Sequence, residues 1–292
     1  MSCGTSTLEE KSEHIPTQPN NQYWHQGKAE ITSYALSQAR YGEIHKGTAV
    51  TVFVTEPFSR KKQVKLDNAQ AAGDDAVEVL KLNLTKSFTT GIYPYSMMTS
   101  VFSPITDFDG ESGKYEHALK VTTSSQEWCG HTFTQINKEN DGYRVDEKSY
   151  FESEGDVISH FENAWLEDEL WSCLRQNPKK LPVGEFDVLP STMSLRLRHQ
   201  PISTVKANAR FEILKGHIKY HVEFEDNRKL IISYIDEAPF QIVGWTETYV
   251  SGSGPSATKL TTTATRLETK MLDYWNLNET EDILYREMLK LD

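Results

Sequence analysis

Leucine fills every second position of the stretch Val79-Leu80-Lys81-Leu82-Asn83-Leu84-Thr85, and a polar side chain follows each leucine. A period of two is the pattern of a β-strand with one covered face and one face in water. The same alternation returns at residues 193–198 and 218–224. One-sided strands are typical of antiparallel sheets, so the sequence predicts a mainly β fold.

The rest of the chain adds more predicted strands and two predicted helical segments. Short turn signals such as Asn140-Asp141-Gly142 separate the strands and favour hairpins over parallel crossovers. Roughly a dozen strands with short connections predict a large curved antiparallel sheet or an open barrel, with one or two short helices. The further strands are expected at 30–39, 48–55, 98–102, 118–123, 131–137, 143–151, 207–214, 229–235, 241–250 and 259–267, and the helices at 163–176 and 279–291.

Length and composition set the domain organisation. The 292 residues, 37% of them hydrophobic, can bury a sizeable core, and they predict a single antiparallel β domain over residues 23–292. Residues 1–22 are polar, contain two prolines and predict a flexible tether. The formal net charge of -11 argues against nucleic acid as a partner.

The N-terminal Met1-Ser2-Cys3-Gly4 resembles the end of a bacterial lipobox, in which a small residue precedes the lipidated cysteine. Three cysteines leave at least one without an internal partner, and Cys3 is the natural candidate. We therefore expect lipid attachment at Cys3, which would make a membrane the partner of the tether. The protein would then be a cell-envelope lipoprotein facing the periplasm or the cell surface. The alternative is an ordinary N-terminal segment whose cysteine has no role.

Glu127, Cys129 and His131 form the strongest constellation for chemistry, because a regular strand would place them on one face. A thiol beside an imidazole and a carboxylate can form a catalytic nucleophile with its base, or can bind zinc. However, neighbours at i and i+2 lie about 6.5–7 Å apart, and Gly130 is a natural place for a bulge. The alternative to a catalytic or metal site is a purely structural role, with Trp128 packed in the core beside a buried Cys129 thiol.

Other candidate sites are weaker. Cys129 and Cys173 could form a disulfide in an oxidising compartment. The segment Asp107-Phe108-Asp109-Gly110-Glu111 lacks the spacing of a calcium loop and indicates an acidic turn. His217 and His221 would lie about 13 Å apart on a strand, too far to bind one metal. The sequence predicts no metal site and no cofactor.

Three further strings carry a family resemblance: Tyr23-Trp24-His25-Gln26-Gly27-Lys28-Ala29-Glu30, Gln38-Ala39-Arg40-Tyr41-Gly42-Glu43-Ile44 and Gln126-Glu127-Trp128-Cys129-Gly130. They resemble an uncharacterised lipoprotein family of Bacteroidota, whose members often carry the label "septum formation inhibitor Maf". True Maf proteins are α/β nucleotide pyrophosphatases with a Ser-Pro-Arg-Arg type motif near the N-terminus, and this β-patterned chain has no such motif. The resemblance implies an envelope location and supplies no catalytic residues.

Three functions remain open at this point. The leading hypothesis is non-enzymatic binding of a lipid, glycan or protein partner, and it predicts a continuous apolar concavity in the sheet. Aromatic clusters such as Tyr93-Pro94-Tyr95 and Tyr274-Trp275 would line that concavity or, alternatively, belong to ordinary core. The second is a hydrolase or metal-dependent enzyme centred on Cys129 and His131. The third is a structural envelope-assembly protein with an exposed apolar patch.

Overall fold

The alternating leucines of residues 79–85 lie in strand β3 (Ala76–Thr90), where their side chains are buried and the intervening polar side chains are partly exposed. β3 pairs antiparallel with both of its neighbours, β2 (Glu43–Ser59) and β4 (Tyr93–Pro104). The prediction of one-sided strands in an antiparallel sheet is therefore confirmed at the stretch from which it was drawn.

A computed structural model describes residues 20–105, 115–252 and 254–291, and the strands in this part of the chain form one sheet of fifteen. The other strands are β1 (Ala29–Arg40), β5 (Lys120–Glu127), β6 (Gly130–Glu139), β7 (Gly142–Ser149), β8 (Val157–Glu162), β9 (Trp165–Leu166), β10 (Gly184–Leu189), β11 (Val205–Leu214), β12 (His217–Phe224), β13 (Lys229–Tyr234), β14 (Ile242–Ser251) and β15 (Thr258–Leu272).

All helical segments of the described residues are short. The α-helices are α1 (Asn20–Trp24), α2 (Ala69–Ala72), α3 (Leu170–Gln176), α4 (Thr192–Arg198) and α5 (Leu284–Met288). The 3-10 turns are η1 (Gly73–Asp75), η2 (Glu152–Glu154), η3 (Glu167–Glu169), η4 (Pro178–Lys180), η5 (Gly254–Ser256), η6 (Tyr274–Asn276) and η7 (Thr280–Ile283).

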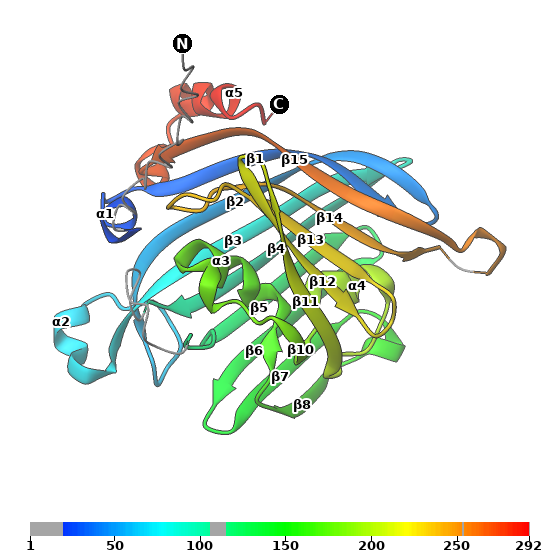
Figure 1. Ribbon diagram of the computed structural model, residues 1–292, viewed down its shortest axis with the longest axis horizontal. Helices are drawn as coiled ribbons and strands as arrows, with labels where there is room; N and C mark the ends of the chain where they lie inside the picture. Colours follow the sequence, from blue (N-terminus) through cyan, green and yellow to red (C-terminus); the bar gives the residue numbers. More distant parts are fainter. Residues whose placement is uncertain (1–19, 106–114, 253, 292) are drawn as a thin grey trace, which may run out of the picture.

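The strand order is β8-β7-β6-β5-β4-β3-β2-β1-β15-β14-β13-β12-β11-β10-β9. The first and last strands of the chain, β1 and β15, are thus neighbours at the middle of the sheet, and a meander extends from each of them (Figure 1). Neighbouring strands are antiparallel except for β9 and β10, which are parallel. The predicted large curved antiparallel sheet is confirmed. It is an open sheet with two edges.

The two halves of this sheet face each other. Open sheets rarely exceed about ten strands without curling, and here β11–β14 cross over β3–β6 with α3 and α4 between them (Figure 1). A side-chain contact across the interior confirms the approach. Lys86 Nζ of β3 lies 2.6 Å from Glu247 Oε1 of β14, although three strands separate β3 from β14 in the sheet.

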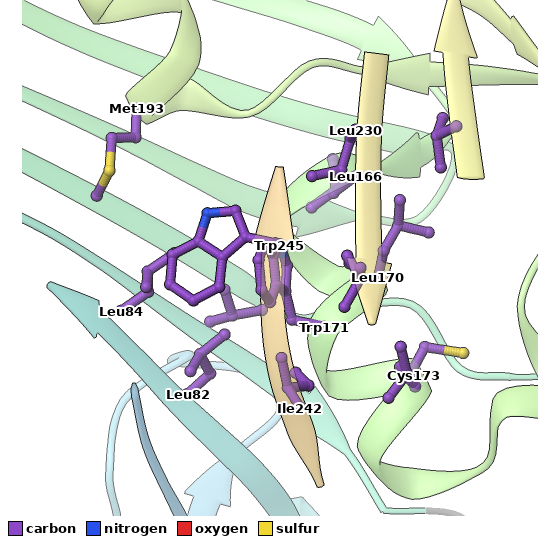
Figure 2. Close-up of a cluster of buried hydrophobic side chains, with 14 of the residues drawn as sticks. Leu82, Leu84, Leu166, Leu170, Trp171, Cys173, Met193, Leu230, Ile242 and Trp245 are labelled. Atoms are coloured by element: carbon purple, nitrogen blue, oxygen red, sulfur yellow. The ribbon is translucent and has the colours of Figure 1, made fainter. Parts of the chain in front are cut away.

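Aromatic and aliphatic side chains fill the space between the halves (Figure 2). The ring of Trp171 on α3 meets the ring of Trp245 on β14 edge-on, with centroids 5.1 Å apart. Leu82 and Leu84 of β3 close the same cluster. The inner surface of the sheet is therefore occupied by packed core, which corrects the expectation of a continuous apolar concavity among the described residues.

Three consecutive acidic residues, Glu167, Asp168 and Glu169, are buried in η3, at the start of the segment that fills the interior. Such burial is rare for carboxylates unless each one is bound. Glu167 pairs with Arg228, whose Nη1 lies 2.7 Å from Oε1. Asp168 Oδ2 accepts hydrogen bonds from the backbone N–H and hydroxyl of Thr192 at the start of α4.

The third carboxylate connects the same segment to the β4–β5 side of the sheet. Glu169 accepts hydrogen bonds from the backbone N–H groups of Ala118, at 2.6 Å, and Leu166, at 3.0 Å. His117 Nδ1 lies 2.7 Å from the same side chain. Together the three acids fix η3 to three separate parts of the fold.

Buried ion pairs hold the interior segment and the two halves together. In each pair both side chains are nearly excluded from solvent, so removal of one partner would leave an uncompensated buried charge. The pairs are Arg175 with Glu30, Lys86 with Glu247, Arg196 with Glu127 and Arg228 with Glu167.

Several sequence-based predictions of local structure were wrong. Residues 193–198, predicted as a strand, form most of helix α4, and the Ser191 side chain caps its first turn by accepting from Ser194 N–H. Nearly every residue of α4 is buried, its polar side chains included, so the helix lacks the division into one exposed polar and one buried apolar face that would identify it.

The predicted helix over 163–176 is also shorter than expected. Residues 165–166 form β9, which extends the sheet beside β10, then η3 follows, and the α-helix itself covers only Leu170–Gln176. Near the C-terminus, the predicted helix over 279–291 is reduced to η7 and α5. Strands β8 and β10 were not predicted at all.

Some predictions fall outside the described residues. Cys3 and most of the predicted tether lie in residues 1–19, and the acidic turn at 107–111 lies in residues 106–114. Helix α1 begins at Asn20, so the predicted boundary between residues 22 and 23 falls inside a short helix. None of the helices in the described part of the chain has the length and apolar character needed to cross a bilayer.

Asp168 should make the stability of the fold depend on pH. Burial, followed by the nearby carboxylate of Glu167, raises its pKa to about 6. The folded state therefore holds this proton more tightly than the unfolded state, so stability falls as pH rises from about 4 to above 6. Asp168→Asn keeps an oxygen acceptor for Thr192 without the charge. Wild type should lose this stability as pH rises, whereas Asp168→Asn has no group to titrate there. We expect the free energy of unfolding of the variant minus that of wild type to be about 2 kcal/mol larger at pH 7.5 than at pH 4.5.

Urea unfolding at the two pH values measures this difference. Asp187→Asn on β10 is the matched control, because the Asp187 side chain is 54% exposed and its loss should give no comparable change. A difference between wild type and Asp168→Asn that is the same at both pH values would contradict the prediction.

Candidate functional site

The three residues singled out for chemistry do not lie along one strand. β5 ends at Glu127 and β6 begins at Gly130, so Trp128 and Cys129 form the turn of a hairpin. Gly130 has φ +153°, and a Cβ atom there would come within 2.5 Å of the Tyr150 ring. This glycine therefore permits the close approach of the next loop and interrupts the alternation that the sequence predicted.

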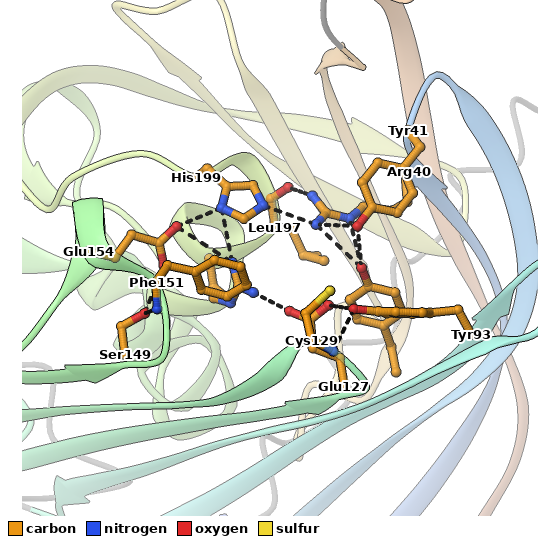
Figure 3. A network of polar contacts seen from close by, with 12 residues as sticks. Arg40, Tyr41, Tyr93, Glu127, Cys129, Ser149, Phe151, Glu154, Leu197 and His199 are labelled. Carbon is orange, nitrogen blue, oxygen red and sulfur yellow. Dashed lines mark hydrogen bonds and ion pairs between the residues drawn. The ribbon is translucent and has the colours of Figure 1, made fainter.

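Glu127 and Cys129 remain close to each other through Tyr93 of β4 (Figure 3). The Tyr93 hydroxyl donates to Glu127 Oε2 at 2.8 Å and accepts from the Cys129 backbone N–H at 2.9 Å. Glu127 is buried, whereas Cys129 is exposed. Two of the three predicted residues thus belong to one polar cluster.

His131 lies elsewhere. It is exposed, pairs with Gln126 across the β5–β6 hairpin and lines an open recess with Phe133 and Tyr150. No hydrogen bond joins His131 to Cys129 in the part of the chain that the structure describes. A cysteine–histidine pair for nucleophilic catalysis is therefore not assembled by these two residues, and the enzyme hypothesis centred on them has no geometric support here.

Glu127 has a further partner on α4, and that partner also contacts the loop after β7. Arg196 of α4 forms an ion pair with Glu127, and its Nη1 lies 3.6 Å from Glu154 Oε1 in η2. The guanidinium carbon of Arg196 also lies 4.5 Å from the centroid of the Phe151 ring. Arg196 therefore links β5 to the β7–β8 connection.

His199 extends the cluster. It follows the last turn of α4 in a left-handed conformation, with φ +51°, and Glu154 Oε1 lies 2.6 Å from its Nδ1. A carboxylate only accepts, so the shorter contact, to Glu154, calls for the imidazole hydrogen on Nδ1 and leaves Nε2 as an acceptor. With this tautomer Arg196 Nη1, 3.1 Å from Nδ1, makes no hydrogen bond to the ring. Nε2 then accepts a hydrogen bond from Nη2 of Arg40, at 3.2 Å.

Arg40 is the final residue of β1, and its neighbours complete the cluster at this end of the sheet (Figure 3). Its Nη1 donates to the carbonyl of Leu197, and its Nη2 lies 3.2 Å from the Tyr41 hydroxyl. The Tyr95 hydroxyl lies 3.4 Å from both Nε and Nη2. Sequence analysis missed Arg40, Arg196 and His199, because their side chains are brought together from distant parts of the chain.

The remaining cysteine and histidine predictions are also decided by the geometry. Cys129 and Cys173 are both free, one exposed at a hairpin turn and the other buried in α3, so the alternative of a disulfide between them was wrong. Burial raises the pKa of the Cys173 thiol well above its usual range. His217 and His221 both lie on β12, and His221 Nε2 contacts Glu212 at 2.7 Å. Within residues 20–105, 115–252 and 254–291, no group of three His, Cys, Asp or Glu side chains could hold a metal ion.

A separate apolar pocket of about 430 Å³ lies at the start of β14. One wall is formed by the β11–β12 hairpin and β13, and the other by the β13–β14 connection and the segment after α3. Arg175 anchors the β13–β14 connection, because its Nε donates to the carbonyl of Pro239 at 2.8 Å. The lining residues are Asn177, Pro178, Lys179, Phe211, Ile213, Ile218, Tyr234, Asp236, Glu237, Ala238 and Phe240.

Comparisons of the chain with protein-family models, with curated proteins and with solved structures found no match. The resemblance to a lipoprotein family of Bacteroidota therefore stays a prediction. The features that bear on function are the polar cluster around Arg40 and Glu127 and the apolar pocket.

Removal of one partner of the Arg196–Glu127 pair should destabilise the fold strongly. Arg196→Met would leave the buried carboxylate of Glu127 without its cation, and removal of one partner of a buried pair typically costs about 3–5 kcal/mol. We expect a loss of that size in the free energy of unfolding, measured by urea titration.

Lys229→Met is the control for this measurement. Lys229 pairs with Glu223, the two side chains are 44% and 50% exposed, and exposed pairs contribute about 1 kcal/mol or less. Equal losses in the two variants would show that the Arg196–Glu127 pair has no special weight.

Proposed function

We propose that this protein is a non-enzymatic binding protein of the cell envelope that takes an apolar or amphipathic ligand, such as one acyl chain of a lipid. The observation that carries the proposal is the pocket of about 430 Å³ between β11, β12, β13 and the β13–β14 connection. Among the candidate functions, ligand binding is the one for which the described residues provide a formed site.

The chemistry of the lining favours an apolar ligand over a glycan. Phe211, Ile213, Ile218, Tyr234 and Phe240 supply aromatic and aliphatic surface. Burial of apolar surface stabilises a complex by about 25 cal/mol per Å², whereas a glycan would need many hydrogen-bonding groups. The charged side chains of the same lining, Lys179, Asp236 and Glu237, provide polar groups for the other end of an amphipathic molecule.

The size of the pocket limits the ligand. Sites for small molecules commonly enclose about 300–1,000 Å³, and 430 Å³ lies near the lower end of that range. It therefore suits a single acyl chain or a small amphiphile. Loops and hairpin ends form most of the pocket, which is where binding residues concentrate on a rigid sheet.

The envelope location is supported by the sequence of residues 1–22. Cys3 in its lipobox-like context and the polar, proline-containing segment after it fit a lipid-anchored tether. Such an anchor would hold a lipid-binding domain close to its source of ligand.

Ile213→Glu should weaken binding of an apolar ligand without unfolding the protein. The Ile213 side chain lines the pocket and is 78% exposed, so the substitution places a charge in the wall but leaves the core unchanged. We expect at least a tenfold loss of affinity for a fluorescent fatty acid, in line with the cost of burying an unpaired charge.

Ile158→Glu is the matched control, because Ile158 is 53% exposed on the edge strand β8 and far from the pocket in strand order. Native mass spectrometry of protein purified from its own envelope should also reveal a bound lipid. Absence of a co-purified lipid together with equal probe binding by the two variants would refute the proposed function.

The lipid anchor has its own test. The precursor with its natural leader should incorporate a palmitate analogue in cells, and Cys3→Ala should abolish the labelling, because the thiol of this cysteine is the predicted attachment point. Cys129→Ala serves as the control and should label like wild type. Labelling that persists in Cys3→Ala would rule out the anchor at this residue.

A further inference from the structure

Arg40 differs from every other buried arginine of the described residues. It is 5% exposed, yet within residues 20–105, 115–252 and 254–291 it has no carboxylate partner. Buried cations are normally paired, because an isolated charge is costly to remove from water. The other buried arginines do pair with glutamate: Arg175 with Glu30, Arg196 with Glu127 and Arg228 with Glu167.

The partners that Arg40 does have are all neutral. They are the carbonyl of Leu197, the hydroxyls of Tyr41 and Tyr95, and the imidazole of His199. The ring of Tyr41 also lies 4.2 Å from the guanidinium carbon. The ring of Tyr95 lies 5.5 Å from the same carbon. The guanidinium is always protonated in proteins, so its positive charge is met only by dipoles and by these two rings.

The nearest acidic side chains are already bound to other groups. Glu127 pairs with Arg196 and accepts from Tyr93. Glu154 binds His199 Nδ1 and lies within ion-pair distance of Arg196. His199 therefore contacts Arg40 through its acceptor nitrogen as a neutral group, and the negative charge stays on Glu154.

The Nε and Nη2 groups of Arg40 form the edge that binds oxyanions in a two-pronged manner. The Tyr95 hydroxyl lies 3.4 Å from both nitrogens of this edge, and Nη2 also contacts the Tyr41 hydroxyl and His199 Nε2, each at 3.2 Å. The two 3.4 Å distances exceed the usual 2.7–3.2 Å of an N–H···O hydrogen bond, so Tyr95 is a weak partner that an anion could replace. The Tyr41 and Tyr95 hydroxyls lie 2.7 Å apart beside it, so one of them donates to the other and the second hydrogen remains available.

Tyr41 lies at the boundary between the buried guanidinium and solvent. Tyr41 and Gly42 form the turn between β1 and β2, both with positive φ, which is the geometry of a tight hairpin turn. The Tyr41 side chain is 52% exposed. Its ring covers the guanidinium at 4.2 Å, so an anion would reach Arg40 where this exposed turn side chain moves aside.

We propose that Arg40, with the hydroxyls of Tyr41 and Tyr95, binds an oxyanion: a phosphate or carboxylate group, carried by a free small molecule or by a lipid headgroup. The anion would bridge the Nε and Nη2 edge and accept from a tyrosine hydroxyl. It would supply the negative charge that the three other buried arginines obtain from glutamate.

This site is independent of the apolar pocket. The pocket lies at the start of β14, whereas Gln38 and Ala39, next to Arg40, contact Tyr249 near the end of β14. Ile242, the first residue of β14, and Tyr249 are seven positions apart on this strand, roughly 23 Å. A negative binding result at one site therefore does not bear on binding at the other.

Two variants test the site at constant ionic strength. Arg40→Lys keeps the charge but removes the two-pronged edge, and Tyr41→Phe removes only one hydroxyl from a half-exposed turn residue. Tyr150→Phe is the matched control, because Tyr150 is 69% exposed and has no contact with Arg40. Circular dichroism and the unfolding midpoint establish that each variant is folded.

Inorganic phosphate and acetate are the free probes, measured by isothermal titration calorimetry against chloride. We expect binding of at least one probe by wild type and by Tyr150→Phe. A fall of about tenfold or more is expected in Arg40→Lys and Tyr41→Phe, since a hydrogen bond to a charged group is lost in each. Flotation with phosphatidylcholine vesicles that contain phosphatidic acid, against phosphatidylcholine alone, tests the headgroup source.

Each outcome decides the proposal. Binding of a free probe that both variants weaken supports a site for small oxyanions, and variant-sensitive binding of phosphatidic acid vesicles alone supports a headgroup site. The proposal is overturned if wild type binds none of these probes, or if Arg40→Lys and Tyr41→Phe bind as tightly as Tyr150→Phe.

Discussion

The burial of three consecutive carboxylates, Glu167, Asp168 and Glu169, is the constraint on which the rest of the fold depends. A sheet of fifteen strands curls because its twist accumulates, and the space it encloses has to be filled. The segment from β9 to α4 fills it, and each carboxylate binds a different part of the surrounding fold. The acids therefore give a mostly apolar interior a defined arrangement, since each buried carboxylate needs its own donors.

Buried ion pairs extend the same logic across the interior. Lys86 with Glu247 joins the two halves of the sheet directly, and Arg175 with Glu30 joins α3 to β1. Such pairs add little net stability compared with apolar side chains of the same volume, but breaking one is costly. In this setting Arg40 is an exception, because its charge is met only by neutral groups. An exception of this kind points to a ligand.

The packing of the interior also decides where an apolar ligand can bind. Trp171, Trp245 and the leucines of β3 occupy the concave face (Figure 2), so a ligand has to use the margin of the sheet. The pocket at the start of β14 provides such a place. Its outer wall includes Ile213, an exposed aliphatic side chain on a hairpin. The two proposed sites thus lie at opposite ends of β14, one apolar and one cationic.

The sequence by itself determined the class of fold, because alternation such as that of Leu80, Leu82 and Leu84 follows from a sheet with one covered face. It also drew attention to Glu127 and Cys129. It could not identify α4, which is buried on all sides and has lost its helical period. Only the tertiary structure separated His131 from Cys129 and brought Arg40, Tyr95 and His199 together, because those contacts join β1, β4 and the end of α4. Cys3 stays a prediction from sequence.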